Sequence, residues 1–221
     1  PDYETTTSFS GIVSVSDGVN TKTQVITVNI NNLNDNDPVF TSSSTFSVNE
    51  NEISVATIPA SDADGDEITF AVSGSDLSIS SSGVLTFLSA PDYENQSTYS
   101  ATITASDSAN SAQQTINISI ININEAPVFT SNTTITADEN QTSIATVAAS
   151  DPEGDSISFS ISGSEILVDS NSGVLTFVSA PDYETKSSYT ATVTASDGSE
   201  SNSQNITVNI NNLNDNAPVI S

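Results

Sequence analysis

Apolar and polar residues alternate along several short stretches of the chain. In residues 99–105 (YSATITA) and 116–120 (INISI), every second residue is apolar, and the residues between carry hydroxyl or amide groups. A period of two places the apolar side chains on one face, as in a half-buried antiparallel strand. Runs of this kind predict seven short strands within one stretch of the chain, at about residues 45–49, 53–60, 67–73, 77–80, 84–88, 98–105 and 112–123. This pattern predicts a two-sheet, Greek-key β-sandwich.

The whole pattern repeats along the chain. The string PDYE occurs at residues 1–4, 91–94 and 181–184, and the residues around it repeat with it. Alignment on Pro38, Pro127 and Pro218 divides the chain into the C-terminal part of one repeat (1–36), two complete repeats (37–125 and 126–216) and the start of another (217–221). We therefore expect an all-β protein made of tandem seven-stranded sandwiches in a linear array.

Aromatic residues recur at matched positions, where we expect them to fill equivalent core sites. These positions are Phe40/Phe129, Phe70/Phe159, Phe87/Phe177 and Phe9/Tyr99/Tyr189. Gly83 and Gly173 precede the fifth strand of each repeat and predict turns that need a positive φ. Residues 1–36 supply only the last two strands of a repeat, and a lone hairpin is at best marginally stable in water. We expect either upstream sequence or a neighbouring copy of the chain to complete it.

The charged residues are almost all acidic. The chain has 28 Asp and Glu residues against Lys22 and Lys186, so its formal net charge is −26. Such a charge repels phosphate backbones and anionic lipids across a Debye length of about 8 Å, which argues against nucleic acid and membrane surfaces as partners. His and Cys are absent, and Ser or Lys alone is no activated nucleophile, so we do not expect an enzyme. No apolar stretch approaches the roughly 20 residues that span a bilayer, so we expect any export or anchoring signal outside this fragment.

The acids recur at the ends of the predicted strands. The matched sets are residues 62–66 (DADGD) and 151–155 (DPEGD), Glu50 and Glu139, and Asp17, Asp107 and Asp197. Ca²⁺ takes six to eight oxygen ligands from carboxylates, carbonyls and water, and loops at strand ends supply them. Around the connector at residues 122–127, we expect seven carboxylates to converge: Glu50, Asp92, Glu94, Glu125, Asp151, Glu153 and Asp197. The alternative is a solvated acidic surface, and Asp66 and Asp155 are either ligands or turn caps.

The order of these residues resembles the cadherin repeat over the whole chain. The resemblance rests on Glu50, the DxD at residues 62–64, the DYE at 92–94, Tyr99, Asp107 and the connectors at 32–38 (NLNDNDP) and 122–127 (NINEAP). It implies Ig-like, cadherin-like sandwiches that share several Ca²⁺ ions at each junction. The metal ligands that we predict are Asp2, Glu4, Asn34, Asp35, Asn36, Glu50, Asp62, Asp64, Asp92, Glu94, Asp107, Asn124, Glu125, Glu139, Asp151, Glu153, Asp182, Glu184, Asp197, Asn214 and Asp215.

The chain also departs from the family pattern. Asparagine stands where the connector usually has its first acid (Asn32, Asn122 and Asn212), and Glu125 and Glu153 stand in aspartate positions. The DADGD and NEAP strings, together with the lack of Cys and Trp, resemble prokaryotic cadherin-like domains more than animal classical cadherins.

These observations predict calcium-rigidified repeats of a large protein that is secreted or lies at the cell surface, where it mediates cell adhesion or matrix attachment. The expected partners are calcium ions, neighbouring repeats or copies of the chain, and a cell-surface protein or polysaccharide. Two other functions stay open. One is a structural unit of an extracellular stalk or self-assembling filament, and the other is a calcium-dependent carbohydrate-binding module.

Overall fold

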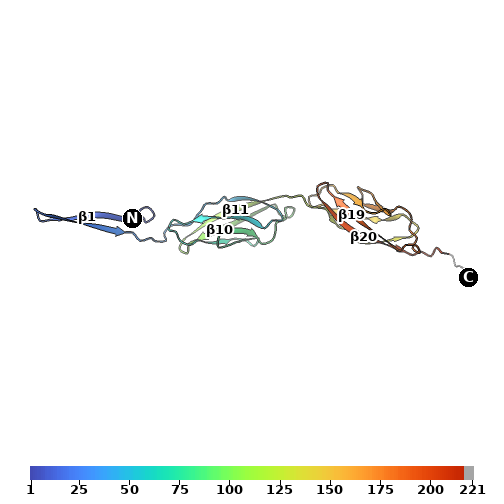
Figure 1. Cartoon of the computed structure of the whole chain (residues 1–221), viewed down its shortest axis with the longest axis horizontal. Coiled ribbons are helices and arrows are strands. Elements are labelled where there is room, and N and C mark those ends of the chain that lie inside the picture. The colour runs from blue at the N-terminus through green and yellow to red at the C-terminus, as the bar shows by residue number, and fades with distance from the viewer. Residues whose placement is uncertain (217–221) are drawn as a thin grey trace. The chain divides into compact units, whose positions relative to one another are not determined.

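The computed structural model describes residues 1–216 and contains only strands, turns and loops in that part of the chain (Figure 1), so the expected all-β class is confirmed. The chain forms two compact units, Pro1–Asn122 and a second unit that begins at Ile123. The predicted repeat start at 217–221 lies outside the described residues. Residues 1–216 contain no helix long and apolar enough to cross a membrane.

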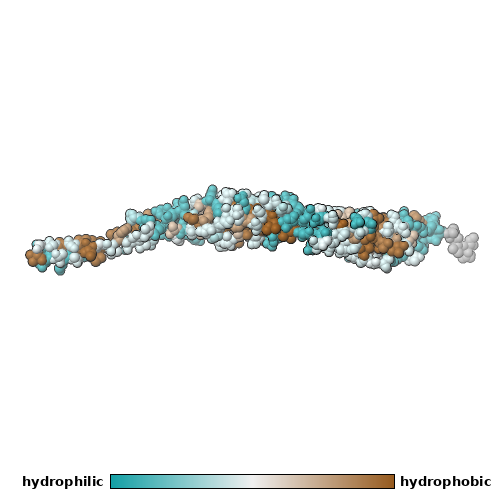
Figure 2. All heavy atoms as spheres, turned by 90° about the horizontal axis from the view of Figure 1, so that it is seen from above, coloured by the Kyte–Doolittle hydropathy of each residue, from teal (hydrophilic) through white to brown (hydrophobic). Residues whose placement is uncertain are grey.

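The first unit begins with a two-stranded hairpin. Strands β1 (Ser8–Ser16) and β2 (Thr21–Asn29) pair antiparallel, with Phe9 opposite Val28. The expectation that Phe9 fills a core site is wrong, because its side chain is 50% exposed. Its counterpart Tyr99 is packed under a second sheet, whereas both faces of the hairpin are open, and Figure 2 shows hydrophobic residues on the hairpin surface.

A β-sandwich follows in the same unit. One sheet has the order β4-β11-β10-β7 and the other β5-β9-β8. Strand β4 runs parallel to β11, while the other pairs in these sheets are antiparallel. The bounds are β4 (Thr45–Asn49), β5 (Ser54–Thr57), β7 (Thr69–Val72), β8 (Leu77–Ile79), β9 (Val84–Phe87), β10 (Thr98–Ser106) and β11 (Ser111–Ile121).

The predicted strand at residues 53–60 is divided in two. Its first part, β5, pairs with β9, and its second part, β6 (Ala60–Ser61), pairs with the short strand β3 (Val39–Phe40). Between them the N–H of Ile58 donates to the carbonyl of Gly83 (2.8 Å). The segment therefore changes its partner strand halfway along, which breaks the ladder at that point.

The second unit repeats this sandwich. Its sheets have the orders β13-β20-β19-β16, β14-β18-β17 and β12-β15. The bounds are β12 (Val128–Phe129), β13 (Thr134–Asp138), β14 (Ser143–Thr146), β15 (Ala149–Ser150), β16 (Ser158–Ile161), β17 (Ile166–Val168), β18 (Val174–Phe177), β19 (Ser188–Ser196) and β20 (Ser201–Asn211).

Apolar side chains from both sheets meet in the core of each sandwich. In the first, Leu85 from one sheet and Ile103 and Ile116 from the other are fully buried. Burial of each such side chain contributes about 1.5–3 kcal/mol relative to exposure. The predicted turn glycines are confirmed, because Gly83 and Gly173 have φ values of +78° and +70°. These cores hold the strands in place, and the loops at the strand ends carry the acids.

Candidate metal centre

The loop after β6 is organised around the carboxylate of Asp62. Its Oδ1 atom accepts hydrogen bonds from the N–H groups of Asp64 (2.9 Å) and Asp66 (3.3 Å). Its Oδ2 atom is buried and has no hydrogen-bond partner among the described residues. One oxygen of each of these three aspartates lies within 4.8 Å of the others. The sequence left Asp66 open between ligand and turn cap. In the structure the carboxylate of Asp62 caps the loop, and Asp66 donates its N–H to that cap while one of its own carboxylate oxygens lies in the cluster.

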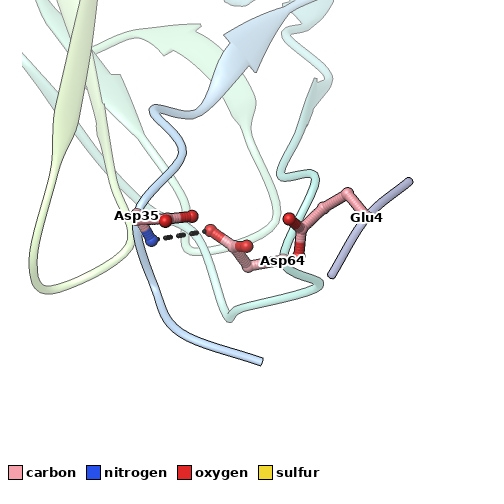
Figure 3. Close-up of side chains that lie close together, drawn as sticks. All are labelled: Glu4, Asp35 and Asp64. Atoms are coloured by element: carbon pink, nitrogen blue, oxygen red, sulfur yellow. Dashed lines mark hydrogen bonds between the residues drawn. The ribbon is translucent and has the colours of Figure 1, made fainter. Parts of the chain in front are cut away.

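Asp64 connects this loop to the connector that follows the hairpin. Its Oδ2 accepts hydrogen bonds from the N–H groups of Asp35 (3.0 Å) and Asn36 (2.9 Å), and its Oδ1 accepts one from the side-chain amide of Asn36 (3.0 Å). Glu4, from the segment before β1, approaches the same carboxylate (Figure 3). Oxygens of Glu4, Asp35 and Asp64 lie within 4.8 Å of one another. Segments distant in sequence thus meet at one acidic cluster.

The pKa values of Asp64 and Glu4 shift in opposite directions. Burial acts to raise the pKa of Asp64, but the hydrogen bonds from Asn36, Glu4 and Asp35 together outweigh it and hold that pKa below its usual range. The backbone N–H of Glu4 favours its charged form, yet lost solvation and the carboxylates of Asp2 and Asp64 raise its pKa. The crowding of like charges therefore falls mainly on Glu4. A bound cation would relieve it.

Asp107 lies directly after β10 and is only 3% exposed. Its Oδ1 accepts hydrogen bonds from the N–H groups of Asn110 (2.7 Å) and Ala109 (2.9 Å), and these bonds, with that of Asn110 first, lower its pKa. Its Oδ2 is buried without a hydrogen-bond partner among the described residues. The amide of Asn34 donates to its carbonyl oxygen (3.3 Å). A buried carboxylate oxygen of this kind is costly unless a cation or a donor reaches it.

Sequence reasoning missed Asn110. Its side-chain amide donates to Oδ1 of Asn34 (2.9 Å) and to the carbonyl of Asn36 (3.2 Å), so it fixes the connector against the loop after β10. The available signal was its position, three residues after the recurring aspartate, where Asn20 and Glu200 also stand.

A second group of predicted ligands lies at the opposite ends of the strands in the first sandwich. Glu50 is 2% exposed and its Oε2 accepts a hydrogen bond from the N–H of Tyr93 (2.9 Å). Glu94 accepts one from the side-chain amide of Asn122 (3.1 Å). Asp92 instead accepts the N–H of Asn95 (3.0 Å), as a turn cap does.

The second sandwich has the same arrangement at the equivalent end. Glu139 is 2% exposed, and its carboxylate accepts the N–H groups of Tyr183 (2.8 Å) and Leu213 (2.7 Å). Oxygens of Glu139, Glu184 and Asp215 lie within 4.8 Å of one another. The structure therefore brings these three predicted ligands together. Two other predicted ligands, Asp2 and Asp182, accept hydrogen bonds within their own turns, from the hydroxyls of Thr5 (2.7 Å) and Thr185 (2.9 Å). Asn214 is exposed.

The other end of the second sandwich carries the remaining predicted ligands. One carboxylate oxygen of Asp151 and one of Glu153 are buried without a hydrogen-bond partner among the described residues. The second oxygen of Glu153 accepts the N–H of Glu125 (3.3 Å). The side-chain amide of Asn124 donates to Asp197 (2.9 Å), and this bond is the largest cause of the lowered pKa of Asp197.

These donor sets suit a hard cation. Every group is a carboxylate, an amide or a backbone carbonyl, and the chain has no His or Cys. Ca²⁺ prefers such oxygen ligands, whereas Zn²⁺ and copper favour nitrogen and sulfur. The partnerless buried oxygens show that the residues present fit Ca²⁺.

Comparison with known proteins gives three kinds of match. The family model described as "Bacterial Ig domain" matches residues 34–119 and 124–210. Human cadherin EGF LAG seven-pass G-type receptor 1 is 32% identical over 87% of this chain, and human protocadherin Fat 1 is 32% identical over 91%. The chain spans only 7% and 5% of these two relatives.

Solved cadherin structures resemble the chain as well. Extracellular cadherin domains 3–6 of protocadherin gamma B2 match at 30% identity with a TM-score of 0.53, over 98% of this chain and 59% of that one. A protocadherin gammaB7 EC3-6 cis-dimer structure matches at 28% identity with a TM-score of 0.54, over 100% of this chain and 63% of that one.

Proposed function

Because this chain belongs to the bacterial Ig domain family and is built from cadherin-like repeats, we propose that it is a calcium-rigidified part of a large extracellular or cell-surface protein. Its role is cell adhesion or matrix attachment, and it is not an enzyme. In this proposal Ca²⁺ ions bind at the strand ends of each sandwich and fix the connectors.

One observation carries the proposal. Four carboxylate oxygens are buried without a hydrogen-bond partner among the described residues, and they belong to Asp62, Asp107, Asp151 and Glu153. Asp62 and Asp151 occupy matched positions in the two repeats, and all four residues are predicted ligands. An ionised oxygen loses its hydration when it is buried and needs a compensating charge. A solvated acidic surface would not bury the same oxygen, Oδ2 of Asp62 and of Asp151, in both repeats.

The mechanism is control of stiffness by an ion. Asp35 and Asn36 of the connector donate backbone N–H groups to Asp64, so the connector already contacts the loop that would bind the ion. Glu4, Asp35 and Asp64 would hold the Ca²⁺ ion, whose charge would offset the short-range repulsion among their carboxylates. With the ion bound, the connector and the loop move together. Without it, repulsion loosens them.

Calcium-dependent unfolding tests this proposal. Thermal unfolding of the wild type and of an Asp62→Asn, Asp107→Asn double variant would be followed from chelated to millimolar free Ca²⁺. The wild type should gain stability with the logarithm of free Ca²⁺, as a ligand of the native state requires, and the variant should gain much less. Asp169→Asn, which removes an exposed acid far from these loops in sequence, is the matched control and should respond as the wild type does. Equal responses in all three proteins would refute the assignment.

Self-association is a second candidate, because the apolar face of the hairpin is exposed in this chain and either a neighbouring copy or further strands of the same protein would cover it. Val13, Val15 and Val28 are 53%, 69% and 55% exposed, and an isolated apolar hairpin gains stability by packing against further strands. The similarity to a protocadherin cis-dimer structure supports the same proposal. Sedimentation velocity with and without Ca²⁺ tests it. A filament-forming unit would show growing assemblies that a Val13→Ser, Val15→Ser variant loses, and a strictly monomeric wild type would contradict it.

A further inference from the structure

Each sandwich carries a small surface pocket at the same place in the repeat. In the first sandwich the pocket has a volume of about 220 Å³ and is lined by Asp76 and Tyr99, among others. In the second, a pocket of about 230 Å³ is lined by the corresponding residues Glu165 and Tyr189. The two pockets thus present an acid and an aromatic ring in the same order.

The surrounding backbone confirms that the positions are equivalent. The N–H of Leu88 donates to the carbonyl of Asp76 (2.8 Å), and the N–H of Val178 donates to the carbonyl of Glu165 (2.9 Å). Each tyrosine ring also packs against a core phenylalanine, with 4.9 Å between ring centroids in both the Phe87–Tyr99 and the Phe177–Tyr189 pair. The shape of the pocket is therefore a property of the repeat.

In the second sandwich, Lys186 of the chain itself binds to this acid and this ring. The Nζ atom of Lys186 lies 2.7 Å from each carboxylate oxygen of Glu165 and 4.3 Å from the centroid of the Tyr189 ring. The ammonium thus has a charge-assisted hydrogen bond on one side and the electron-rich face of a ring on the other.

The first sandwich has the acid and the ring but not the cation. Gln96 occupies the position of Lys186, since the N–H groups of both residues donate at 2.9 Å to the carbonyl of the preceding aspartate of the PDYE string. The side-chain amide of Gln96 turns to the carbonyl of Thr98 (2.9 Å). Within residues 1–216, the carboxylate of Asp76 accepts a single, long hydrogen bond of 3.5 Å from the hydroxyl of Ser75.

Two carboxylates lie near the ring of the first pocket. Burial raises the pKa of the Tyr99 hydroxyl, and the carboxylates of Asp76 and Asp92 raise it further. Both acids therefore lie close enough to Tyr99 to act on a charge placed beside it.

We propose that the Asp76–Tyr99 pocket of the first sandwich binds the ammonium group of a lysine on a basic partner protein, in the way that the second sandwich binds its own Lys186. The chain as a whole favours such a partner, because a net charge of −26 attracts basic proteins. A single exposed ammonium site is weak, so the pocket acts as one anchor within a larger contact. The proposal does not depend on calcium binding at the strand ends.

A pair of small probes tests it directly. Nα-acetyl-lysine methylamide would be titrated into the calcium-saturated protein at constant ionic strength, and the tyrosine ring resonances followed by NMR. The same compound acetylated at Nε is the uncharged control. We expect Tyr99 to shift with the charged probe and to saturate in the millimolar range, and Tyr189 to stay unchanged because Lys186 already occupies its site. The uncharged probe should shift neither ring.

Exchanging the two natural residues should exchange the behaviour of the two pockets. Gln96→Lys gives the first pocket its own ammonium and should abolish the Tyr99 shift. Lys186→Gln frees the second pocket and should create a Tyr189 shift. Each substitution introduces the residue that the other repeat has at that position, so both variants should fold.

Four results would overturn the proposal. The first is equal shifts of Tyr99 and Tyr189 in the wild type, and the second is an equal effect of the uncharged probe. The third is no Tyr99 shift at any probe concentration. The fourth is loss of the shift on removal of Ca²⁺ at constant ionic strength. That result would show that the amine binds at the metal-bound loop and not in the pocket.

Discussion

Replacement of Gly83 by alanine should destabilise the first sandwich far more than the same change at Gly74. Both glycines have a left-handed backbone, with φ values of +78° and +92°. A Cβ atom at Gly83 would lie 2.5 Å from the carbonyl oxygen of Ile58, whereas a Cβ at Gly74 would meet nothing within 4 Å. The pair therefore separates backbone strain, which both variants have, from a clash, which only one has.

The magnitude follows from these two terms. A left-handed alanine costs about 1–2 kcal/mol, partly offset by about 0.4–1 kcal/mol because alanine also restricts the unfolded chain. Gly74→Ala should thus lose about 1 kcal/mol. The backbone oxygen of Ile58 cannot move freely, since the N–H of the same residue donates to Gly83 and its side chain is fully buried. Overpacking of this kind adds about 1–3 kcal/mol, so Gly83→Ala should lose about 2–4 kcal/mol.

Urea unfolding at saturating Ca²⁺, followed through the NMR amide signals of β10, measures both variants in the same sandwich. The midpoint should fall in both, and further in Gly83→Ala, with an unchanged dependence on urea. A Gly83→Ala variant no less stable than Gly74→Ala would refute the argument. It would mean that the turn before β9 relaxes without disturbing Ile58.

Three further predictions concern single side chains. The carboxylate of Asp169 accepts the hydroxyl (2.7 Å) and N–H (2.8 Å) of Ser172, and these bonds lower its pKa. Its contribution is therefore present above the unfolded pKa of about 3.9 and lost as pH falls through the lower folded value. Asp169→Asn should be less stable than the wild type at pH 6 and equal to it at the acid end of a pH series, and a gap that widens toward acid pH would contradict this. Lys186→Gln should cost less than about 1 kcal/mol, and the cost should shrink with added salt, because the ion pair is exposed; a salt-independent loss in thermal unfolding would exclude this electrostatic origin. Ile103→Ala, at a fully buried position, should cost about 2–5 kcal/mol in urea unfolding, and a loss below about 1 kcal/mol would show that the core collapses around the deletion.

Local alternation was enough to find the long strands. Residues 99–105 alternate apolar and hydroxyl side chains, and β10 (Thr98–Ser106) lies there. The turn at Gly83 was equally readable, because a positive φ selects glycine whatever the rest of the fold does. Both signals reside in a few consecutive residues and in their repetition along the chain.

The pairing of strands that are distant in sequence could not be predicted from local patterns. Strand β3 has only two residues, too few to show an alternation of apolar and polar side chains. The segment at 53–60 divides into two strands because its first part pairs with β9 and its second part with β3. Phe9 matches Tyr99 in sequence, yet it is exposed because no second sheet among residues 1–216 covers the hairpin. Burial is a property of the covering strands and not of the residue itself.

The same division holds for the candidate metal centre. The sequence by itself determined which residue types recur at the strand ends, and hence that oxygen ligands for a hard cation are present in every repeat. Only the tertiary structure decided which carboxylate oxygens are turn caps, as in Asp92, and which are buried without a partner, as in Asp62 and Asp107. It also decided that Asn110 fixes the connector across more than 70 residues of sequence. The physical reason is that ligand types are set residue by residue, whereas desolvation and hydrogen bonding arise only when distant segments pack together.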